Sequence, residues 1–238
     1  MKALLAFCLS IAALTCSAET LRVGFPSAIP PYVMDRELKG LDCDLIVAAA
    51  RRAGFEIVPL FAPRERLMHL LDSRDVDAIA SVNPDYQVKA AFSNVYIEYH
   101  NYAVALTSRK LAINSIGDLS SYSVVSFQRA RFALGKDFLN MATANPRYHE
   151  EAQEIARNTL LYSGKADVAI TDRRIFEYFN RQLADKVDTS QPLTWYPLFP
   201  PTRYRVGFLK NDLRDRFNAG LAAIRASGEY DAIVKRYD

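Results

Sequence analysis

The chain has 238 residues, of which 50% are hydrophobic and 24% are charged, and its formal net charge is +3. This balance excludes a disordered or fibrous chain, and so small a charge gives no indication of nucleic-acid binding. The nine glycines nowhere approach the spacing of a glycine-rich phosphate loop, which excludes the common nucleotide-binding motifs.

Residues 1–18 are predicted to form a signal peptide. Lys2 provides the positive start, the run from Ala3 to Leu14 is apolar, and Cys16-Ser17-Ala18 supplies small residues before a cleavage site. The apolar run is too short to span a bilayer, so we expect cleavage after Ala18 and export of a soluble chain to the periplasm. The alternative is lipoprotein processing at Cys16, for which the preceding Leu14-Thr15 is a poor match.

The first half of the mature chain alternates predicted strands and helices. Apolar patterning predicts strands at 21–25, 56–61 and 77–82, with helices at 42–53 and 66–73 between them. Pro30-Pro31 predicts an extended loop after the first strand, and Gly54 supplies a left-handed end to the first helix. This βαβαβ order indicates a parallel sheet covered by helices on both faces.

The pattern then begins again, which predicts a second lobe. Further strands are expected at 102–106, 124–127, 167–171, 193–199 and 204–209. Helical segments are expected at 115–119, 132–142, 149–160, 172–183 and 212–226, followed by a last turn or two after Gly228.

Motifs for catalysis or metal binding are scarce. Cys43 is the one cysteine of the predicted mature chain, so no internal disulfide is expected; its flanking carboxylates raise a thiol pKa and favour an inert, buried thiol. His69, His100 and His149 share no metal-binding spacing, and no nucleophile elbow or zinc motif occurs. We therefore expect no metal, no cofactor and no catalytic residue.

Seven segments in register resemble the family 3 extracellular solute-binding proteins, the polar-amino-acid receptors of ABC importers. The resemblance spans essentially the whole mature chain. It rests on LRVGF at 21–25 with PPY at 30–32, KGLDCDL at 39–45, DAIAS at 77–81, FSNVY at 92–96, INSIGDLS at 113–120, GKADVAITD at 164–172 and SGEYDAIVKRY at 227–237.

The resemblance implies an α/β, two-lobed fold of the periplasmic-binding-protein type II. Each lobe is then a mostly parallel sheet flanked by helices, and two crossing strands form a hinge below a ligand cleft. The expected bounds are 19–104 with 203–238 for lobe 1, and 105–202 for lobe 2. The crossings are expected near Val104–Thr107 and Phe199–Arg203.

Two departures from the family pattern concern the ligand carboxylate. Amino-acid-binding members hold it with an Arg in a T-x-x-R segment after the DAI strand, but here the shorter loop 81–89 reads SVNPDYQVK. Tyr86 or Lys89 replaces that Arg, depending on the direction of alignment. The family's Q-G-T-T at a helix N-terminus is replaced by Gln128-Arg129-Ala130-Arg131.

The implied cleft is more cationic than that of an ordinary amino-acid receptor. Arg64 stands where many members place a stacking aromatic residue, Pro26 stands where some place an Asp, and Asp172 retains the partner of the ligand amino group. The candidate ligand-binding residues are Tyr32, Arg64, Ser81, Asn83, Tyr86, Gln128, Arg129, Arg131 and Asp172. Five of them have a structural alternative: the three arginines as solvated surface residues, Asp172 as a helix N-cap and Tyr32 as a packed aromatic.

The sequence thus predicts a monomeric, non-catalytic periplasmic receptor for a small polar solute that is anionic or zwitterionic and amino-acid-like. It would deliver the solute to an ABC permease of the inner membrane, with cleft closure as its mechanism. The alternatives are an enzyme on the same scaffold, similar to periplasmic cyclohexadienyl dehydratases, and a soluble ligand sensor.

Overall fold

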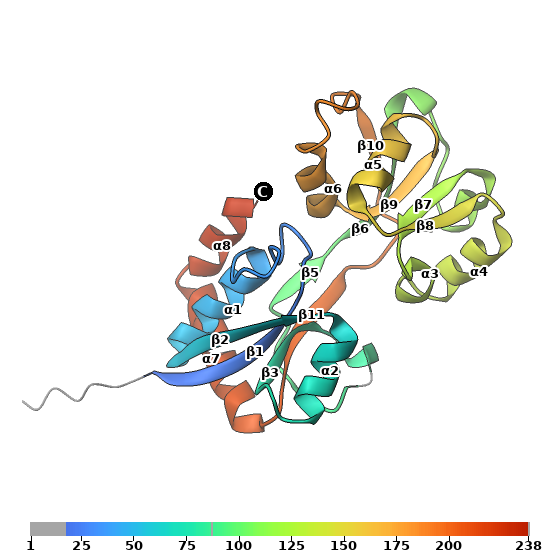
Figure 1. Cartoon of the computed structure of the whole chain (residues 1–238). Helices are drawn as coiled ribbons and strands as arrows, with labels where there is room; N and C mark the ends of the chain where they lie inside the picture. The colour runs from blue at the N-terminus through green and yellow to red at the C-terminus, as the bar shows by residue number, and fades with distance from the viewer. Residues whose placement is uncertain (1–17, 87, 238) are drawn as a thin grey trace, which may run out of the picture.

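The computed structural model describes residues 18–86 and 88–237, arranged as two lobes joined by two chain crossings (Figure 1). Residues 1–17 of the predicted signal peptide, with the alternative lipid site Cys16, lie outside the described residues. Within the part of the chain that is described, no helix combines the length and apolar composition that a membrane span requires.

Lobe 1 is built on a sheet with the strand order β2-β1-β3-β11-β4, to which β5 is added by pairing with β11. β1 is parallel to β2 and β3, whereas β11 is antiparallel to its partners. The strands are β1 (Glu19–Pro26), β2 (Phe55–Ala62), β3 (Ala78–Val82), β4 (Ala91–Phe92), β5 (Ile97–Tyr99) and β11 (Thr202–Phe208). The helices are α1 (Leu41–Arg52), α2 (Arg64–Asp72), α7 (Asn211–Ala226) and α8 (Glu229–Val234). They cover both faces, because α1 and α7 share one apolar core with the sheet while α2 packs into another.

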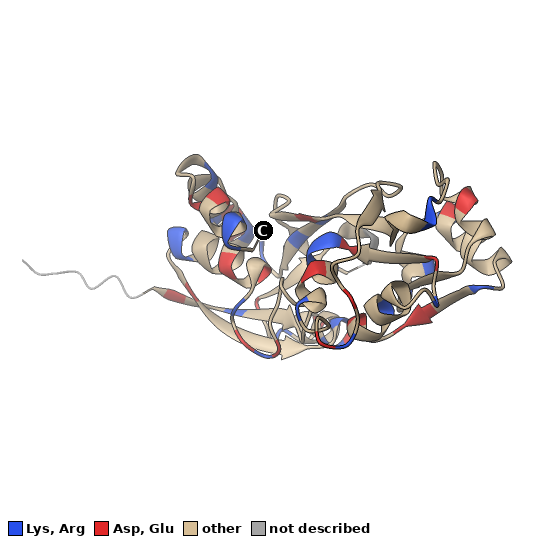
Figure 2. Cartoon of the chain, turned by 90° about the horizontal axis from the view of Figure 1, so that it is seen from above, with Lys and Arg blue, Asp and Glu red and all other residues tan. Residues whose placement is uncertain are grey.

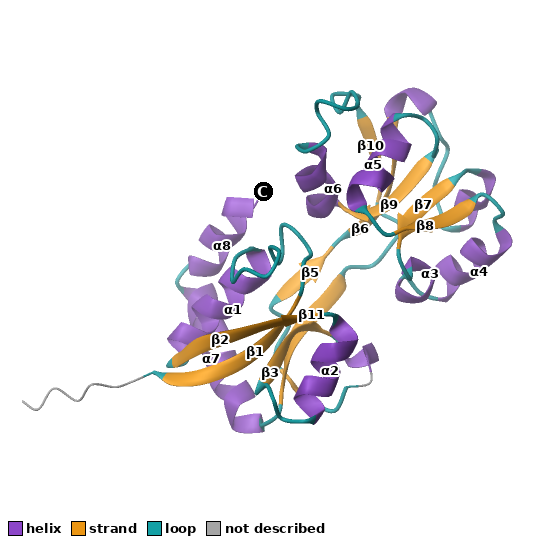
Figure 3. Ribbon diagram, in the orientation of Figure 1, coloured by secondary structure: helices purple, strands orange, loops and turns teal. Residues whose placement is uncertain are grey.

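Lobe 2 has a sheet with the order β10-β6-β9-β7-β8, in which β7 is parallel to β8 and β9 (Figure 3). The strands are β6 (Asn101–Leu106), β7 (Val124–Phe127), β8 (Tyr148–Glu151), β9 (Val168–Asp172) and β10 (Leu193–Tyr196). The helices are α3 (Ala130–Ala133), α4 (Lys136–Ala144), α5 (Glu154–Tyr162) and α6 (Arg173–Asn180). Short 3-10 turns lie at Pro84–Tyr86, Thr107–Arg109, Gly117–Ser121 and Lys235–Tyr237.

Two predicted helices of lobe 2 differ from the observed elements. The segment 132–142 is divided into α3 and α4 at Gly135, whose φ of 92° lies outside the helical region. The start of the predicted helix 149–160 is instead the edge strand β8, because its backbone pairs with β7. Pairing with a neighbouring strand has overridden the local helical pattern there.

The first crossing lies earlier than the expected Val104–Thr107. β5 ends at Tyr99 in the lobe 1 sheet, and β6 begins at Asn101 with pairing to β9 in the lobe 2 sheet. His100 therefore joins the two sheets, and Val104 is already an interior residue of lobe 2, opposite Ala169. The second crossing runs from the end of β10 at Tyr196 through Pro200-Pro201 to the start of β11 at Thr202, and so overlaps the expected Phe199–Arg203 but begins before it.

A buried carboxylate ties together the elements of lobe 1 that face the crossing. Asp42, in the first turn of α1, has no exposed surface, and its Oδ2 accepts hydrogen bonds from Ser81 Oγ at 2.5 Å, Tyr96 Oη at 2.8 Å and Tyr99 Oη at 3.0 Å. Its Oδ1 is buried without a hydrogen-bond partner. Burial raises the pKa of Asp42 from 3.8 to about 6, against the lowering effect of the three hydroxyl donors.

Helices α1 and α7 approach each other closely at Gly220. A Cβ atom built at this position would lie 2.0 Å from the carbonyl oxygen of Ala49. Only a residue without a side chain fits between the two backbones, and this contact positions α7 against α1.

Gly220→Ala is expected to lower the free energy of unfolding by about 1–3 kcal/mol, because the added methyl group forces the two helices apart. Intrinsic helix propensity alone predicts the opposite change, a gain of about 1 kcal/mol. Urea denaturation followed by circular dichroism measures the difference, with Ala222→Gly on the exposed side of α7 as a calibration of propensity. A variant more stable than the parent would contradict the close contact.

Asp42→Asn is expected to remove a pH dependence of stability. Because the folded carboxyl has the higher pKa, it binds its proton more tightly than the unfolded one, and stability falls as the pH rises from about 4 to about 6. A difference of roughly two pKa units corresponds to roughly 3 kcal/mol. In denaturation at pH 4 and pH 7, the stability of the Asn variant relative to the parent should therefore be higher at pH 7 than at pH 4. Asp215→Asn, which changes an exposed residue of α7, should show no such difference. A parent–variant difference independent of pH would refute the assignment.

Candidate ligand-binding cleft

A cavity of about 1210 Å³ is lined by residues of both lobes. Its walls include the ends of strands: Ser81 at the end of β3, Gln128 after β7 and Asp172 at the end of β9. The carboxyl ends of parallel strands are the usual place for ligands in open α/β sheets. Seven of the nine candidate residues line this cavity, namely Arg64, Ser81, Asn83, Tyr86, Gln128, Arg129 and Asp172, whereas Tyr32 and Arg131 do not.

A row of four tyrosines lies on the lobe 1 side of the cavity, and three of them, Tyr86, Tyr99 and Tyr204, line it. Tyr32 and Tyr99 are stacked with ring centroids 3.7 Å apart, and Tyr99 meets Tyr204 edge-on at 4.7 Å. The row continues to Tyr86, whose hydroxyl lies 3.4 Å from that of Tyr204. Tyr99 and Tyr204 line the cavity although the sequence analysis did not select them, and their places beside the two crossings become apparent only in the folded chain.

Arg64 is the first residue of α2 and lies over the last ring of this row. Its guanidinium carbon is 4.6 Å from the centroid of the Tyr86 ring, a favourable cation–π arrangement. The Nε atom of Arg64 is buried without a hydrogen-bond partner. Tyr86 is one of the two residues that the alignment placed at the missing carboxylate clamp, and the other, Lys89, is exposed and does not line the cavity.

Asp172 marks the other end of the tyrosine row, at the junction of β9 and α6. Its side chain is the N-cap of α6 through the Ile175 N–H, and it also accepts hydrogen bonds from the His100 N–H at 2.9 Å and from Tyr32 Oη at 3.0 Å. The capping role and a position on the cavity wall therefore coexist, with 4% of the residue exposed. Burial raises the pKa of Asp172, although these donors act in the opposite direction.

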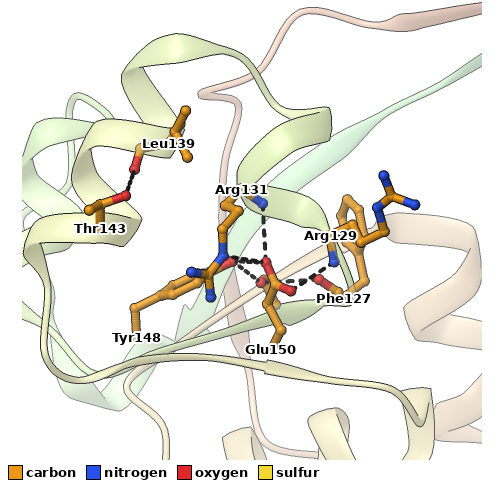
Figure 4. A network of polar contacts seen from close by, with 8 residues as sticks. Phe127, Arg129, Arg131, Leu139, Thr143, Tyr148 and Glu150 are labelled. Carbon is orange, nitrogen blue, oxygen red and sulfur yellow. Dashed lines mark hydrogen bonds and ion pairs between the residues drawn. The ribbon is translucent and has the colours of Figure 1, made fainter. Parts of the chain in front are cut away.

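Arg131 belongs to a polar network on lobe 2 (Figure 4). Arg131 does not line the cavity, although Arg129 of the same network does. Glu150 accepts hydrogen bonds from the backbone N–H of Arg129 at 2.8 Å, from Nε of Arg131 at 3.1 Å and from Tyr148 Oη at 2.8 Å. Burial opposes ionisation, but these donors hold the pKa of Glu150 below its usual value. The backbone donors at the start of α3, which the family resemblance assigned to a ligand carboxylate, here bind the protein's own carboxylate.

Arg129 lies at the edge of the cavity and forms an ion pair across it. Its Nη1 is 3.1 Å from Oε1 of Glu65 on α2, and the two side chains are 75% and 64% exposed. The sequence analysis expected a cationic cleft, but the charged residues of the lining are four acids and three arginines. Figure 2 likewise shows positive and negative residues interspersed over both lobes.

Arg157 of α5 is a cavity residue that the sequence analysis missed. Only 1% of the residue is exposed, and it forms an ion pair with Glu154 and a 3.4 Å contact with the Thr171 hydroxyl. Its Nε and Nη1 atoms are buried without hydrogen-bond partners, and burial lowers the pKa of Arg157 to about 10. No local signal marks it, since an Arg three residues after a Glu is typical of a solvated helix face.

Two curated proteins of similar sequence are both named as probable histidine-binding proteins. The protein from Neisseria gonorrhoeae is 24% identical over 207 residues, which cover 84% of this chain and 75% of that protein. The protein from Campylobacter jejuni is 25% identical over 242 residues, with coverages of 92% and 85%.

Solved structures share the fold. An ancestral cationic amino acid solute-binding protein, AncCDT-1, superimposes with a TM-score of 0.70 at 19% identity, covering 93% of this chain and 96% of its own. A histidine kinase sensor domain with similarity to periplasmic binding proteins gives a TM-score of 0.69 at 20% identity, with coverages of 93% and 96%.

A family model also matches most of the chain. The model of the bacterial extracellular solute-binding proteins, family 3, matches residues 21–237, which span both lobes and both crossings. It confirms the family suggested by the motifs and agrees with the two-lobed α/β architecture. The chain is therefore a member of the bacterial extracellular solute-binding proteins, family 3.

Proposed function

We propose that this protein is a periplasmic receptor that captures a zwitterionic amino acid between its lobes and delivers it to an ABC permease. The observation that carries the proposal is the position of Asp172, a buried carboxylate on the wall of an interlobe cavity whose other lining carboxylates are exposed or paired with arginines. A ligand ammonium group on that wall gains a charge-assisted hydrogen bond in a low-dielectric site.

The charges of the cavity favour a zwitterion over a purely anionic solute. Four acids against three arginines in the lining give a local balance of −1, which disfavours a net negative ligand. The similar proteins named for histidine binding and for cationic amino acids support the same ligand class. An amino acid with a neutral or basic side chain is therefore the ligand we propose.

Closure of the cleft would be the mechanism of capture. The lobes are joined by two short crossings, at His100 and at Pro200-Pro201, which suits a hinge. Ligand contacts to both lobes would stabilise the closed form, which a permease distinguishes from the open one. A kinase-linked sensor domain has the same fold, so a signalling partner is the alternative recipient of the closed form.

A second candidate function is a dehydratase reaction, because burial raises the pKa of Asp172 and so favours a carboxyl group able to donate a proton. The fold neighbour AncCDT-1 is described as a precursor of cyclohexadienyl dehydratase. Incubation of the purified protein with prephenate, followed by ultraviolet detection of phenylpyruvate, is expected to show no turnover if the protein is a receptor. Turnover that is lost in Asp172→Asn would instead establish the enzyme.

Asp172→Asn is expected to weaken amino-acid binding by about thirtyfold or more, because the neutral amide cannot balance an ammonium group in a buried site. Asparagine remains a good helix N-cap, so α6 should be retained. Isothermal titration with L-histidine, L-arginine and L-glutamine gives the affinities, and the N-acetyl derivatives, which lack the ammonium group, provide the reference ligands.

The matched control is Glu177→Gln, which removes a half-exposed carboxylate from the same helix and should leave affinity within about threefold. Equal affinity of Asp172→Asn and the parent would remove Asp172 from the binding site. Failure of every amino acid to bind the parent would overturn the proposed function itself.

A further inference from the structure

We propose that Arg64, held on the ring of Tyr86, binds the ligand carboxylate in place of the missing clamp arginine. The inference deepens the proposed function and rests on it, since it concerns the opposite end of the same zwitterionic ligand. In the family the clamp arginine lies in the loop after β3. The geometry points to an arginine at the start of α2 that supplies the guanidinium group here.

The arginines of the cavity differ in whether their charge is already balanced. Arg129 is paired with Glu65 at 3.1 Å, and Arg157 is paired with Glu154. Among the described side chains, which do not include that of Asp85, no carboxylate forms an ion pair with Arg64, and the Arg64 guanidinium lies against the neutral ring of Tyr86. It is therefore the cavity arginine whose charge is still open to a ligand anion.

The environment of Arg64 suits recognition of a carboxylate. Its Nε is buried and lacks a hydrogen-bond partner, which leaves a donor in the fork of the guanidinium unused. A planar carboxylate accepts two parallel hydrogen bonds from such a fork. Binding would satisfy the buried donor and neutralise the charge in one step, whereas an amide or alcohol would satisfy only the donor.

Tyr86 acts as the positioning residue. Its ring lies 4.6 Å from the Arg64 guanidinium, and its hydroxyl is 3.4 Å from that of Tyr204, which itself packs on Tyr99. Stacking restricts the flexible arginine side chain to one face of the cavity. Tyr86, one of the two residues aligned with the family's clamp arginine, thus positions another arginine.

The two charged ends of the site also lie on the same tyrosine row. At one end Asp172 accepts a hydrogen bond from Tyr32, and at the other the Arg64 guanidinium makes a cation–π contact with Tyr86. Asp172 of lobe 2 and Arg64 of lobe 1 line the same cavity, so closure of the cleft on an amino acid would present its ammonium group to lobe 2 and its carboxylate to lobe 1. The ligand class that follows is a free amino acid with an unmodified carboxylate.

The test combines Arg64→Gln with removal of the ligand's negative charge. L-histidine and L-arginine are titrated against their carboxamides, L-histidinamide and L-argininamide, by calorimetry on the parent, on Arg64→Gln and on Arg66→Gln. Arg66 is an exposed residue of the same helix outside the cavity lining, and its variant serves as the matched control.

The parent and Arg66→Gln should prefer the acid over the amide by at least about thirtyfold, and Arg64→Gln should lose that preference while keeping its affinity for the amide. Tyr86→Leu should reduce the preference by a smaller factor, and Tyr86→Phe, which keeps the ring, should retain most of it. A full acid preference in Arg64→Gln overturns the inference and leaves the receptor function intact. Absence of binding by both acids and both amides to the parent overturns the receptor function as well.

Discussion

The stacked pair of Tyr32 and Tyr99 is the contact on which the organisation of the site depends. The two rings are 3.7 Å apart, and each hydroxyl binds a different buried carboxylate: Tyr32 donates to Asp172 of lobe 2, and Tyr99 donates to Asp42 of lobe 1. One aromatic contact therefore couples the first turn of α1, the crossing between β5 and β6, and the end of β9. Buried carboxylates are tolerated only with such donors, so the tyrosines and the acids require each other.

Internal pairing of charges explains why a chain rich in arginine has no cationic cleft. Glu150 takes the donors at the start of α3 together with Arg131, Glu65 takes Arg129, and Glu154 takes Arg157. Arg129 and Arg131, which stand where the family pattern has small residues, are thus each paired with a carboxylate. In the proposed receptor, specificity would then depend on the few charged groups of the cavity that have no such partner, because they interact differently with ligands of different charge.

Much of this structure could be predicted from the sequence, because the apolar patterns of β1, α1, β3 and α7 agree with their tertiary environment. The exceptions are segments whose conformation depends on a distant partner. β8 is a strand because it pairs with β7, and the first crossing falls at His100 because Asn101 already pairs with Asp172. Most of the candidate residues that were selected by their motif position line the cavity. The pairing of Arg131 with Glu150 was missed, because it joins residues nineteen apart in sequence and no spacing rule predicts it.

The ion pair between Arg129 and Glu65 gives the lobes a contact that depends on the surrounding electrolyte. Both side chains are mostly exposed, so dissolved ions screen their attraction, over about 8 Å at physiological ionic strength and over a much shorter range in strong brine. The Tyr32–Asp172 contact joins the same two lobes but is buried and largely insensitive to such screening. Of these two contacts between the lobes, the Arg129–Glu65 ion pair therefore weakens as the salinity of the surrounding solution rises, whereas the Tyr32–Asp172 hydrogen bond keeps its strength.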